Sequence, residues 1–184
     1  MGGQAADYAA TCRLLDGRLA SLRRLAPDDA EAVAALHRNL DDRDRYLRFF
    51  TLSSAHLDQL VEELTEPGVG QCAVGAFEGD RLIGVANYAV STDPTVADIA
   101  VVVANKEHSH GVGTALLRHL AEIAVAHGIR RFAADVLAEN HLMFQVLFDF
   151  GWRRTRLSCG AVSHMEFELP DCRPSASTAV AQGV

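Results

Sequence analysis

Apolar residues recur at helical spacing in two segments near the start of the chain. The first begins at Pro27, where the fixed φ of proline and two following aspartates favour a helix start, and it extends to about Leu40. The second follows Ser53 and Ser54, which favour an N-cap, and its apolar positions are Leu57, Leu60, Val61 and Leu64. Residues 44–50 between them predict a short aromatic helix, and residues 8–15 are compatible with a short helix.

Runs of β-branched and aromatic residues predict a sheet in the middle of the chain. Leu19–Leu25 indicates a first strand. Cys72–Phe77 and Leu82–Val90 are two further strands, separated by residues 78–81, whose composition is that of a hairpin turn. A fourth strand, Ala97–Val103, ends in four consecutive apolar residues, as expected where both faces of a sheet are covered.

The second half of the chain alternates between helix and strand. Residues 114–127 predict an amphipathic helix, which Gly128 can end in a left-handed conformation. A fifth strand is predicted at residues 131–136, and a helix that Gly151 ends is predicted at residues 140–150. Residues 152–158 and 162–169 predict the two arms of a closing hairpin.

Composition and charge narrow the class of protein. The chain has 184 residues, 49% of them hydrophobic, which suits one domain with a substantial core. Its formal charge of −7 argues against a nucleic-acid-binding surface. The sequence lacks a long apolar run and a basic leader, so we expect a cytoplasmic protein that does not contact membranes. The cysteines are scattered and the histidines lack metal-ligand spacing, so neither a disulfide framework nor a metal site is expected.

The loop after the fourth predicted strand carries the strongest chemical signal. It reads His108-Ser109-His110-Gly111-Val112-Gly113 and leads straight into a predicted helix. Backbone N–H groups and the positive end of the dipole meet at a helix start, and glycine lets a diphosphate approach the backbone closely. Neither a Rossmann fingerprint nor a P-loop is present. Two glycines before a helix fit a purely structural tight turn as well.

The order of elements and this loop together resemble the GNAT acetyltransferases, whose hallmark Arg/Gln-x-x-Gly-x-Gly/Ala follows the fourth strand. His108 departs from the first position of that motif. Residues 137–143 and 148–152 are similar to the family's Asn-containing segment and to its following helix end. The resemblance implies a single α/β (α+β) domain with a mixed sheet of about six or seven strands, flanked by helices and splayed between strands four and five. This domain would span residues 18–169, after an N-terminal extension at 1–17 and before a disordered tail at 170–184.

The same resemblance implies acetyl-CoA as co-substrate, with no metal. Asn140 would hydrogen-bond the pantetheine arm, and the backbone N–H near Val101 would polarise the thioester carbonyl. Phe148 stands where many members carry a tyrosine that protonates the departing thiolate. The residues that the resemblance assigns to coenzyme A binding are Val101, Val102, Val103, His108, Ser109, His110, Gly111, Val112, Gly113, Thr114, Asn140, Met143 and Phe144.

Within the superfamily, residues 45–50, 97–103 and 136–140 look like the bacterial Pat-type protein lysine acetyltransferases. This implies a protein lysine as acceptor, such as one on an acyl-CoA synthetase, and Asp98 as general base where the Pat-type enzymes carry glutamate. Asp98 also fits a purely structural carboxylate, and Glu139 is the second candidate for the base. A small-molecule amine acetyltransferase and a degenerate acyl-CoA-binding sensor module are the alternatives, and both a monomer and a dimer are compatible with the sequence.

Overall fold

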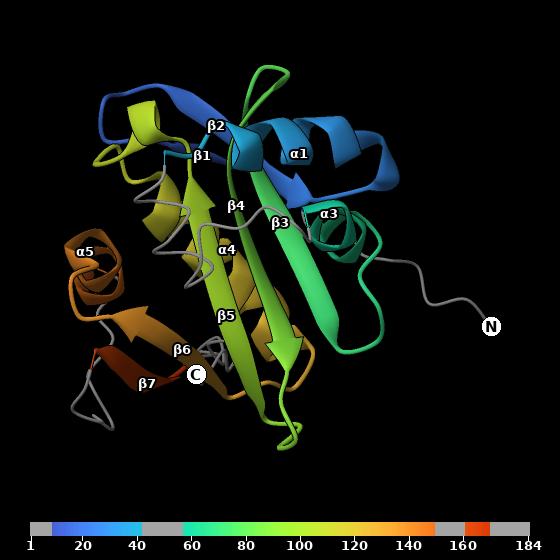
Figure 1. The fold of residues 1–184 in the computed structure, drawn as a ribbon, viewed down its shortest axis with the longest axis vertical. Coiled ribbons are helices and arrows are strands. Elements are labelled where there is room, and N and C mark those ends of the chain that lie inside the picture. The colour runs from blue at the N-terminus through green and yellow to red at the C-terminus, as the bar shows by residue number, and fades with distance from the viewer. Residues whose placement is uncertain (1–8, 42–56, 150–160, 170–184) are drawn as a thin grey trace, which may run out of the picture.

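The computed structural model describes residues 9–41, 57–149 and 161–169, which form a seven-stranded sheet with helices on both faces (Figure 1). The strands are β1 (Ala10–Arg13), β2 (Leu19–Arg24), β3 (Gln71–Glu78), β4 (Arg81–Val90), β5 (Val96–Val103), β6 (Arg131–Leu137) and β7 (Val162–Glu168). The helices are α1 (Ala30–Arg38), α3 (Leu57–Thr65), α4 (Val112–Ala126) and α5 (His141–Asp149), with short 3-10 turns at Pro27–Asp29 and Asn105–Glu107.

The strands lie in the sheet in their chain order, β1 to β7. Every neighbouring pair is antiparallel except β5 and β6, which are parallel and are joined through α4. In Figure 1, α4 lies behind the central strands, whereas α1 and α3 lie on the side that faces the viewer. This arrangement confirms the predicted mixed sheet flanked by helices.

Two hydrophobic clusters hold these layers together, one on each face of the sheet. The larger cluster joins the sheet to α4 through side chains such as Leu116 and Leu120, which are fully buried. The smaller cluster joins the other face to α1 and α3 through Val33 and Leu64. Val102 points into the smaller cluster, whereas its neighbour Val101 packs against the larger one. The apolar run at the end of β5 is therefore covered on both faces, as the sequence predicts.

Strands β5 and β6 pair only over their first residues. The last parallel pair joins Asp98 and Ala133, and beyond it the two strands separate. From there β6 keeps its antiparallel ladder with β7, and β5 keeps its ladder with β4. The fourth and fifth strands predicted from the sequence are β5 and β6 of the structure. The predicted splay between them is therefore confirmed.

The N-terminal segment differs from its prediction. Residues 8–15 are compatible with a short helix from the sequence, but Ala10–Arg13 forms β1 and pairs antiparallel with β2. The helix prediction is therefore wrong, because pairing with an available strand edge overrides a weak local preference. The sheet also begins within the segment 1–17, which the sequence assigns to an N-terminal extension.

The remaining helix predictions agree with the structure to within a few residues. Helix α4 begins at Val112 rather than at Thr114, because Gly111 already serves as its N-cap. The predicted aromatic helix at 44–50, the first arm of the closing hairpin at 152–158 and the tail at 170–184 lie outside the described residues.

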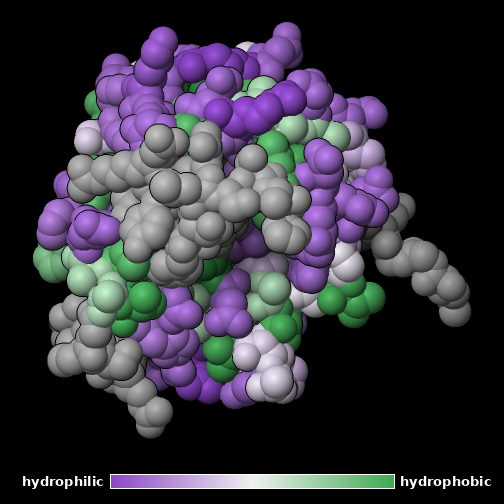
Figure 2. Space-filling model, in the orientation of Figure 1, coloured by the Kyte–Doolittle hydropathy of each residue, from purple (hydrophilic) through white to green (hydrophobic). Residues whose placement is uncertain are grey.

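The surface toward the viewer carries hydrophilic side chains along its upper rim, and its hydrophobic groups form small separate patches (Figure 2). Within the described ranges, no helix combines the length and hydropathy that a membrane span requires.

Candidate active site

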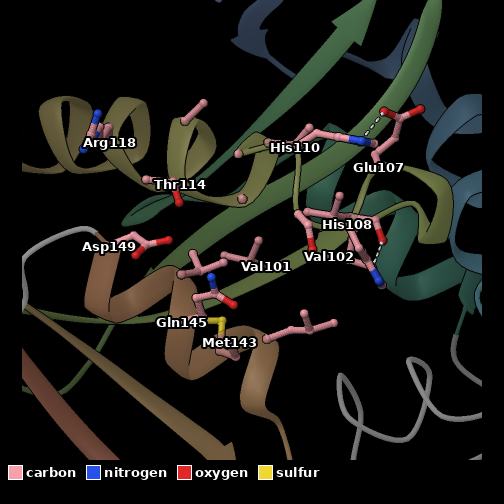
Figure 3. A pocket seen from close by; sticks show the side chains of 18 of the residues that line it. Val101, Val102, Glu107, His108, His110, Thr114, Arg118, Met143, Gln145 and Asp149 are labelled. Atoms are coloured by element: carbon pink, nitrogen blue, oxygen red, sulfur yellow. Dashed lines mark hydrogen bonds and ion pairs between the residues drawn. The ribbon is translucent and has the colours of Figure 1, made fainter. Parts of the chain in front are cut away.

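A cavity of about 610 Å³ opens where β5 and β6 separate. The end of β5, the loop before α4, the first turns of α4 and the inner side of α5 form its walls (Figure 3). All residues that the sequence assigns to coenzyme A line this cavity except Phe144, which packs against the main core instead. The predicted cofactor residues, which come from three separate segments, thus meet around one space.

The loop before α4 presents its backbone to the cavity. Gly111 is the N-cap of α4 with φ of 83°, and Ser109 also has a positive φ of 65°. Among the described residues no side chain caps this helix, so the first N–H groups of α4 have neither an intrahelical nor a side-chain acceptor there. Four such groups beside the positive end of a 15-residue helix form an anion site of the kind that binds a diphosphate.

Gly113 serves the close packing of two helices. A Cβ atom at this position would lie 3.3 Å from Val146 Cγ2 of α5, which is closer than almost any normal contact. The absence of a side chain therefore lets α5 approach the first turn of α4 and narrows the cavity between them.

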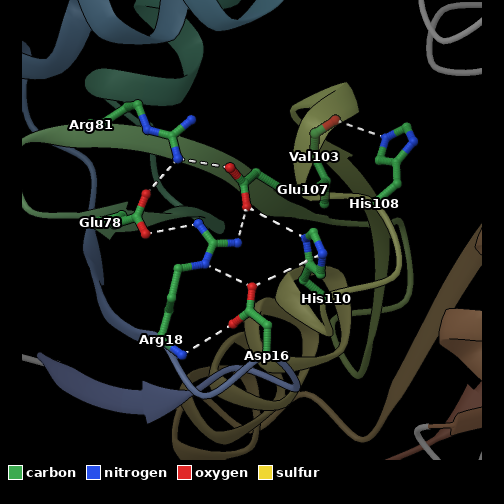
Figure 4. Close-up of polar contacts among 8 residues, drawn as sticks. All are labelled: Asp16, Arg18, Glu78, Arg81, Val103, Glu107, His108 and His110. Carbon is green, nitrogen blue, oxygen red and sulfur yellow. Dashed lines mark hydrogen bonds and ion pairs between the residues drawn. The ribbon is translucent and has the colours of Figure 1, made fainter.

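A buried carboxylate anchors the loop from behind. Glu107 is only 4% exposed and accepts hydrogen bonds from Arg18 Nη2 at 2.6 Å and from Arg81 Nη2 at 2.7 Å (Figure 4). Arg18 directly precedes β2 and Arg81 is the first residue of β4, so the network ties three segments together. The hydrogen bond from Arg18 holds the pKa of Glu107 below its ordinary value.

One of the two histidines of the loop also serves as an anchor. Nε2 of His108 lies 3.1 Å from the carbonyl oxygen of Val103, so the imidazole connects the loop to the end of β5. The His110 ring turns toward Glu107 and Asp16, with Nδ1 3.7 Å from the Glu107 carboxylate (Figure 4). The substitution of His108 for the motif's Arg or Gln therefore leaves the backbone cradle in place.

The backbone of β5 supplies further polar groups to the opening. The carbonyl of Thr95 accepts a hydrogen bond from the Arg131 N–H, on the side of β6, whereas the Ala104 N–H donates to Ile83, on the side of β4. Because the direction of hydrogen bonding alternates along a strand, the backbone groups of Val101 and Val103 face the opening and those of Val102 face β4.

Helix α5 forms the third wall and begins with a side-chain cap. Asn140 lines the cavity, and its Oδ1 accepts the N–H of Met143 at 3.0 Å. Among the described residues no acceptor pairs with its amide nitrogen, which suits the pantetheine contact that the resemblance implies. Phe148 is 80% exposed and does not line the cavity, so it stands apart from any leaving group there.

Neither candidate base lines the cavity itself. Asp98 is exposed on the sheet face opposite α4, at the last residue pair before β5 and β6 separate. Glu139 is exposed in the turn that follows β6.

Several lining residues were not predicted from the sequence. Arg118 lies one helical turn after Thr114 on the same side of α4, and this i, i+4 spacing could have indicated it. Arg13 was missed because its segment was assigned to a helix, and Asp135 because it is a lone carboxylate within a strand. Gln145 and Asp149 follow Asn140 along α5 and also face the cavity (Figure 3).

The comparison with known proteins decides the family. The model of the acetyltransferase (GNAT) family matches residues 31–147, more than half of the chain. The chain belongs to this family. It is an acetyltransferase, and acetyl-CoA is its co-substrate.

Individual relatives agree with this assignment. Acetyltransferase PA5475 of Pseudomonas aeruginosa is 28% identical over 133 residues, which cover 70% of this chain and 72% of that protein. The crystal structure of the GNAT domain of S. lividans PAT is 31% identical, with a TM-score of 0.81 over 91% of this chain and 100% of that one. The structure of yncA from Salmonella typhimurium with acetyl-CoA shares the fold at 17% identity, with a TM-score of 0.66 over 85% of this chain and 98% of that one.

The residues of this cavity fit acetyl-CoA. The uncapped start of α4 suits its diphosphate, the exposed backbone of β5 suits its amide-bearing arm, and the opening beside β6 suits its thioester. When bound, acetyl-CoA supplies an acetyl group activated as a thioester. Within the ranges that the structure describes, no three His, Cys, Asp or Glu side chains lie close enough together to hold a metal ion.

Proposed function

We propose that this GNAT enzyme acetylates a lysine ε-amine on a protein in the cytoplasm, with Asp98 as the general base. The observation that carries the proposal is the position of Asp98 at the vertex of the β5–β6 opening. The side chain lies on the face opposite α4, so a thioester held from the α4 side meets an amine that arrives from the Asp98 side.

Removal of a proton is the chemical task on the acceptor side. A lysine ammonium has an ordinary pKa of about 10.4 and cannot attack a carbonyl until it loses a proton. Asp98 is about 1.5 Å shorter than the glutamate of Pat-type enzymes, so it acts directly or through one water. The backbone N–H of Val101 would polarise the thioester carbonyl during the attack.

The choice of a protein lysine rests on two similarities. The chain resembles Pat-type enzymes in its sequence segments, and it matches the GNAT domain of S. lividans PAT over 91% of its length. An acyl-CoA synthetase is the acceptor class that this resemblance favours. The net charge of −7 is compatible with a basic acceptor surface.

The direct test follows radiolabelled acetyl-CoA into a purified acyl-CoA synthetase and into small amines. Asp98→Asn should reduce turnover by about 10²- to 10⁴-fold without weakening acetyl-CoA binding. Asp80→Asn, in the exposed β3–β4 turn, is the matched control and should behave as the wild type. Glu139→Gln separates the second candidate from the first, because only the true base should show the large loss.

Each alternative has a distinct outcome. Label that enters small amines but no protein would indicate a small-molecule acetyltransferase. Tight binding of acetyl-CoA without thiol release from any amine would indicate a sensor module, which the departures of His108, Asp98 and Phe148 from the usual family residues motivate.

A further inference from the structure

Two arginines line the cavity without a hydrogen-bond or ion-pair partner for their guanidinium groups among the described residues. Arg13 comes from β1 and Arg118 from α4, and both are exposed. In contrast, Arg18 and Arg81, which hold the loop from behind, are each paired with carboxylates. Two free positive charges beside a cavity that fits acetyl-CoA indicate that a further anionic group of this ligand is recognised there.

Acetyl-CoA carries a phosphate that the start of α4 does not serve. Its 5′-diphosphate suits the backbone N–H groups of the first turn, but the same ribose also carries a 3′-phosphate. This group is a monoester, and such groups have a charge of about −1.5 to −2 at neutral pH. Only the first four N–H groups of a helix lack an intrahelical acceptor. Recognition of a phosphate beyond the first turn of α4 therefore needs a side chain.

The position of Arg118 along α4 suits this second phosphate. Arg118 follows Thr114 by four residues, a rise of about 6 Å, and both side chains line the cavity from the same side of the helix (Figure 3). A ribose ring with its two phosphate esters spans a comparable distance. A nucleotide whose diphosphate rests on the first turn can therefore bring its 3′-phosphate to the Arg118 guanidinium.

A purely structural role explains Arg118 poorly. An arginine on a helix surface commonly pairs with a carboxylate one turn away, and Glu122 occupies that position. Within the described ranges, however, Arg118 pairs with no carboxylate, and the nearest recorded partner of Glu122 is Nδ1 of His119 at 3.9 Å. The N–H donors of Arg118 are therefore available to a ligand.

The second arginine, Arg13, is less well placed for this task. The diphosphate cradle and Arg118 belong to one helix, so a rigid element fixes the spacing between them. Arg13 belongs to β1, and its position relative to the cradle depends on the turn between β1 and β2. Arg13 therefore provides a test of whether any free arginine of the cavity would serve.

We propose that Arg118 binds the 3′-phosphate of acetyl-CoA and so makes the enzyme prefer this co-substrate over its dephosphorylated form. The planar guanidinium can donate two parallel N–H bonds to two phosphate oxygens. No bond is made or broken in this step, so Arg118 acts on the affinity for acetyl-CoA and for the product coenzyme A. The inference holds whichever amine is the acceptor.

The experiment compares coenzyme A with dephospho-coenzyme A, which lacks only the 3′-phosphate. Calorimetric titration of the full chain gives the Kd of each ligand. The wild type should bind coenzyme A about tenfold more tightly, because a charge-assisted hydrogen bond keeps part of its strength at an exposed position. Arg118→Ala should bring the two Kd values together, mainly by raising the Kd of coenzyme A. A structural role would instead raise both values equally.

Two further substitutions separate charge from geometry. Arg118→Lys keeps the positive charge but loses the planar fork, so it should retain only part of the preference for coenzyme A. Arg118→Glu places a negative charge beside the 3′-phosphate, so dephospho-coenzyme A should become the tighter ligand. High salt should reduce the preference of the wild type, because it screens charges at an exposed position.

Arg130→Ala is the matched control. Arg130 is also exposed and lies just beyond the other end of α4, but it does not line the cavity. Its replacement should leave both Kd values as in the wild type. Arg13→Ala should leave the ratio of the two Kd values unchanged. The melting temperature of each variant shows whether it is folded.

Three results would overturn the proposal. The wild type could bind both ligands equally well, a folded Arg118→Ala protein could keep the full preference, or Arg13→Ala could abolish it in place of Arg118→Ala. None of these results touches the proposed function, which the transfer of label and the Asp98 variants test. Conversely, a failure to acetylate protein lysines would leave this inference intact as long as coenzyme A binds.

Discussion

Replacement of Gly111 by alanine isolates the backbone cradle from every side-chain effect. Gly111 has φ of 83°, a left-handed conformation that costs a residue with a Cβ atom about 1–2 kcal/mol. The new Cβ would lie 3.1 Å from Cγ of Leu15, but that side chain is 81% exposed and can turn away. Backbone strain is therefore the main cost, and it corresponds to a fall in melting temperature of about 2–8 °C for a protein of this size.

The same substitution should weaken acetyl-CoA binding. Relief of the strain rotates the peptide groups at the start of α4 and moves their N–H groups away from the diphosphate. A hydrogen bond to a charged group contributes about 1.5–3 kcal/mol. Loss of one such bond would raise the Kd about 10- to 100-fold.

Gly128 provides the matched control, because it ends the same helix with φ of 85° and has open space around its Cβ position. Gly128→Ala should lower the melting temperature by a similar amount while the Kd for acetyl-CoA stays the same. Calorimetric titration and thermal unfolding of both variants provide the measurements. If Gly111→Ala loses stability but binds acetyl-CoA like the wild type, the cradle does not hold the diphosphate and the reasoning is refuted.

Two further variants test the groups that support the site. Glu107→Gln should reduce stability at neutral pH by on the order of 1 kcal/mol. Arg18 lowers the pKa of Glu107 in the folded state. The stabilisation that the Glu107 carboxylate contributes is therefore complete above its ordinary pKa of about 4.3, and it disappears as the pH falls through the lower pKa of the folded state. Unfolding curves should therefore show a smaller acid-induced loss in Glu107→Gln than in the wild type, and equal losses would contradict this account. Asn140→Ala should cost about 1 kcal/mol by removing the cap of α5, whereas Asn140→Asp should keep the cap. A Kd for acetyl-CoA that rises in Asn140→Asp without a change in melting temperature would support the pantetheine contact, and an unchanged Kd would argue against it.

Local patterns predicted most of the fold. The helical spacing of apolar residues identified α1, α3, α4 and α5, because an α-helix places residues at that spacing on one side, where they can be buried together. The exception was β1, whose four residues carry no periodic signal and become a strand only through their pairing with β2.

The candidate cradle for the diphosphate was also predicted from the sequence. A strand, a glycine loop and a helix in succession bring the N–H groups of the helix start next to the loop, and all the groups involved are neighbours in the chain. What the sequence alone could not indicate is how the loop is held. Arg18 and Glu107 are 89 positions apart, and their contact depends on where the β1–β2 turn meets the loop.

The arrangement of polar residues beside the opening between β5 and β6 was decided by the tertiary structure. Asp98 and Asp135 belong to two neighbouring strands, and each is an ordinary polar residue in its own segment. Strand order, register and the separation of β5 from β6 bring them to one face of the sheet beside one opening. The sequence by itself determined the periodicities and the special backbone angles, because these depend on near neighbours, whereas the pairing of strands depends on the burial of the whole sheet and is set only when the chain folds.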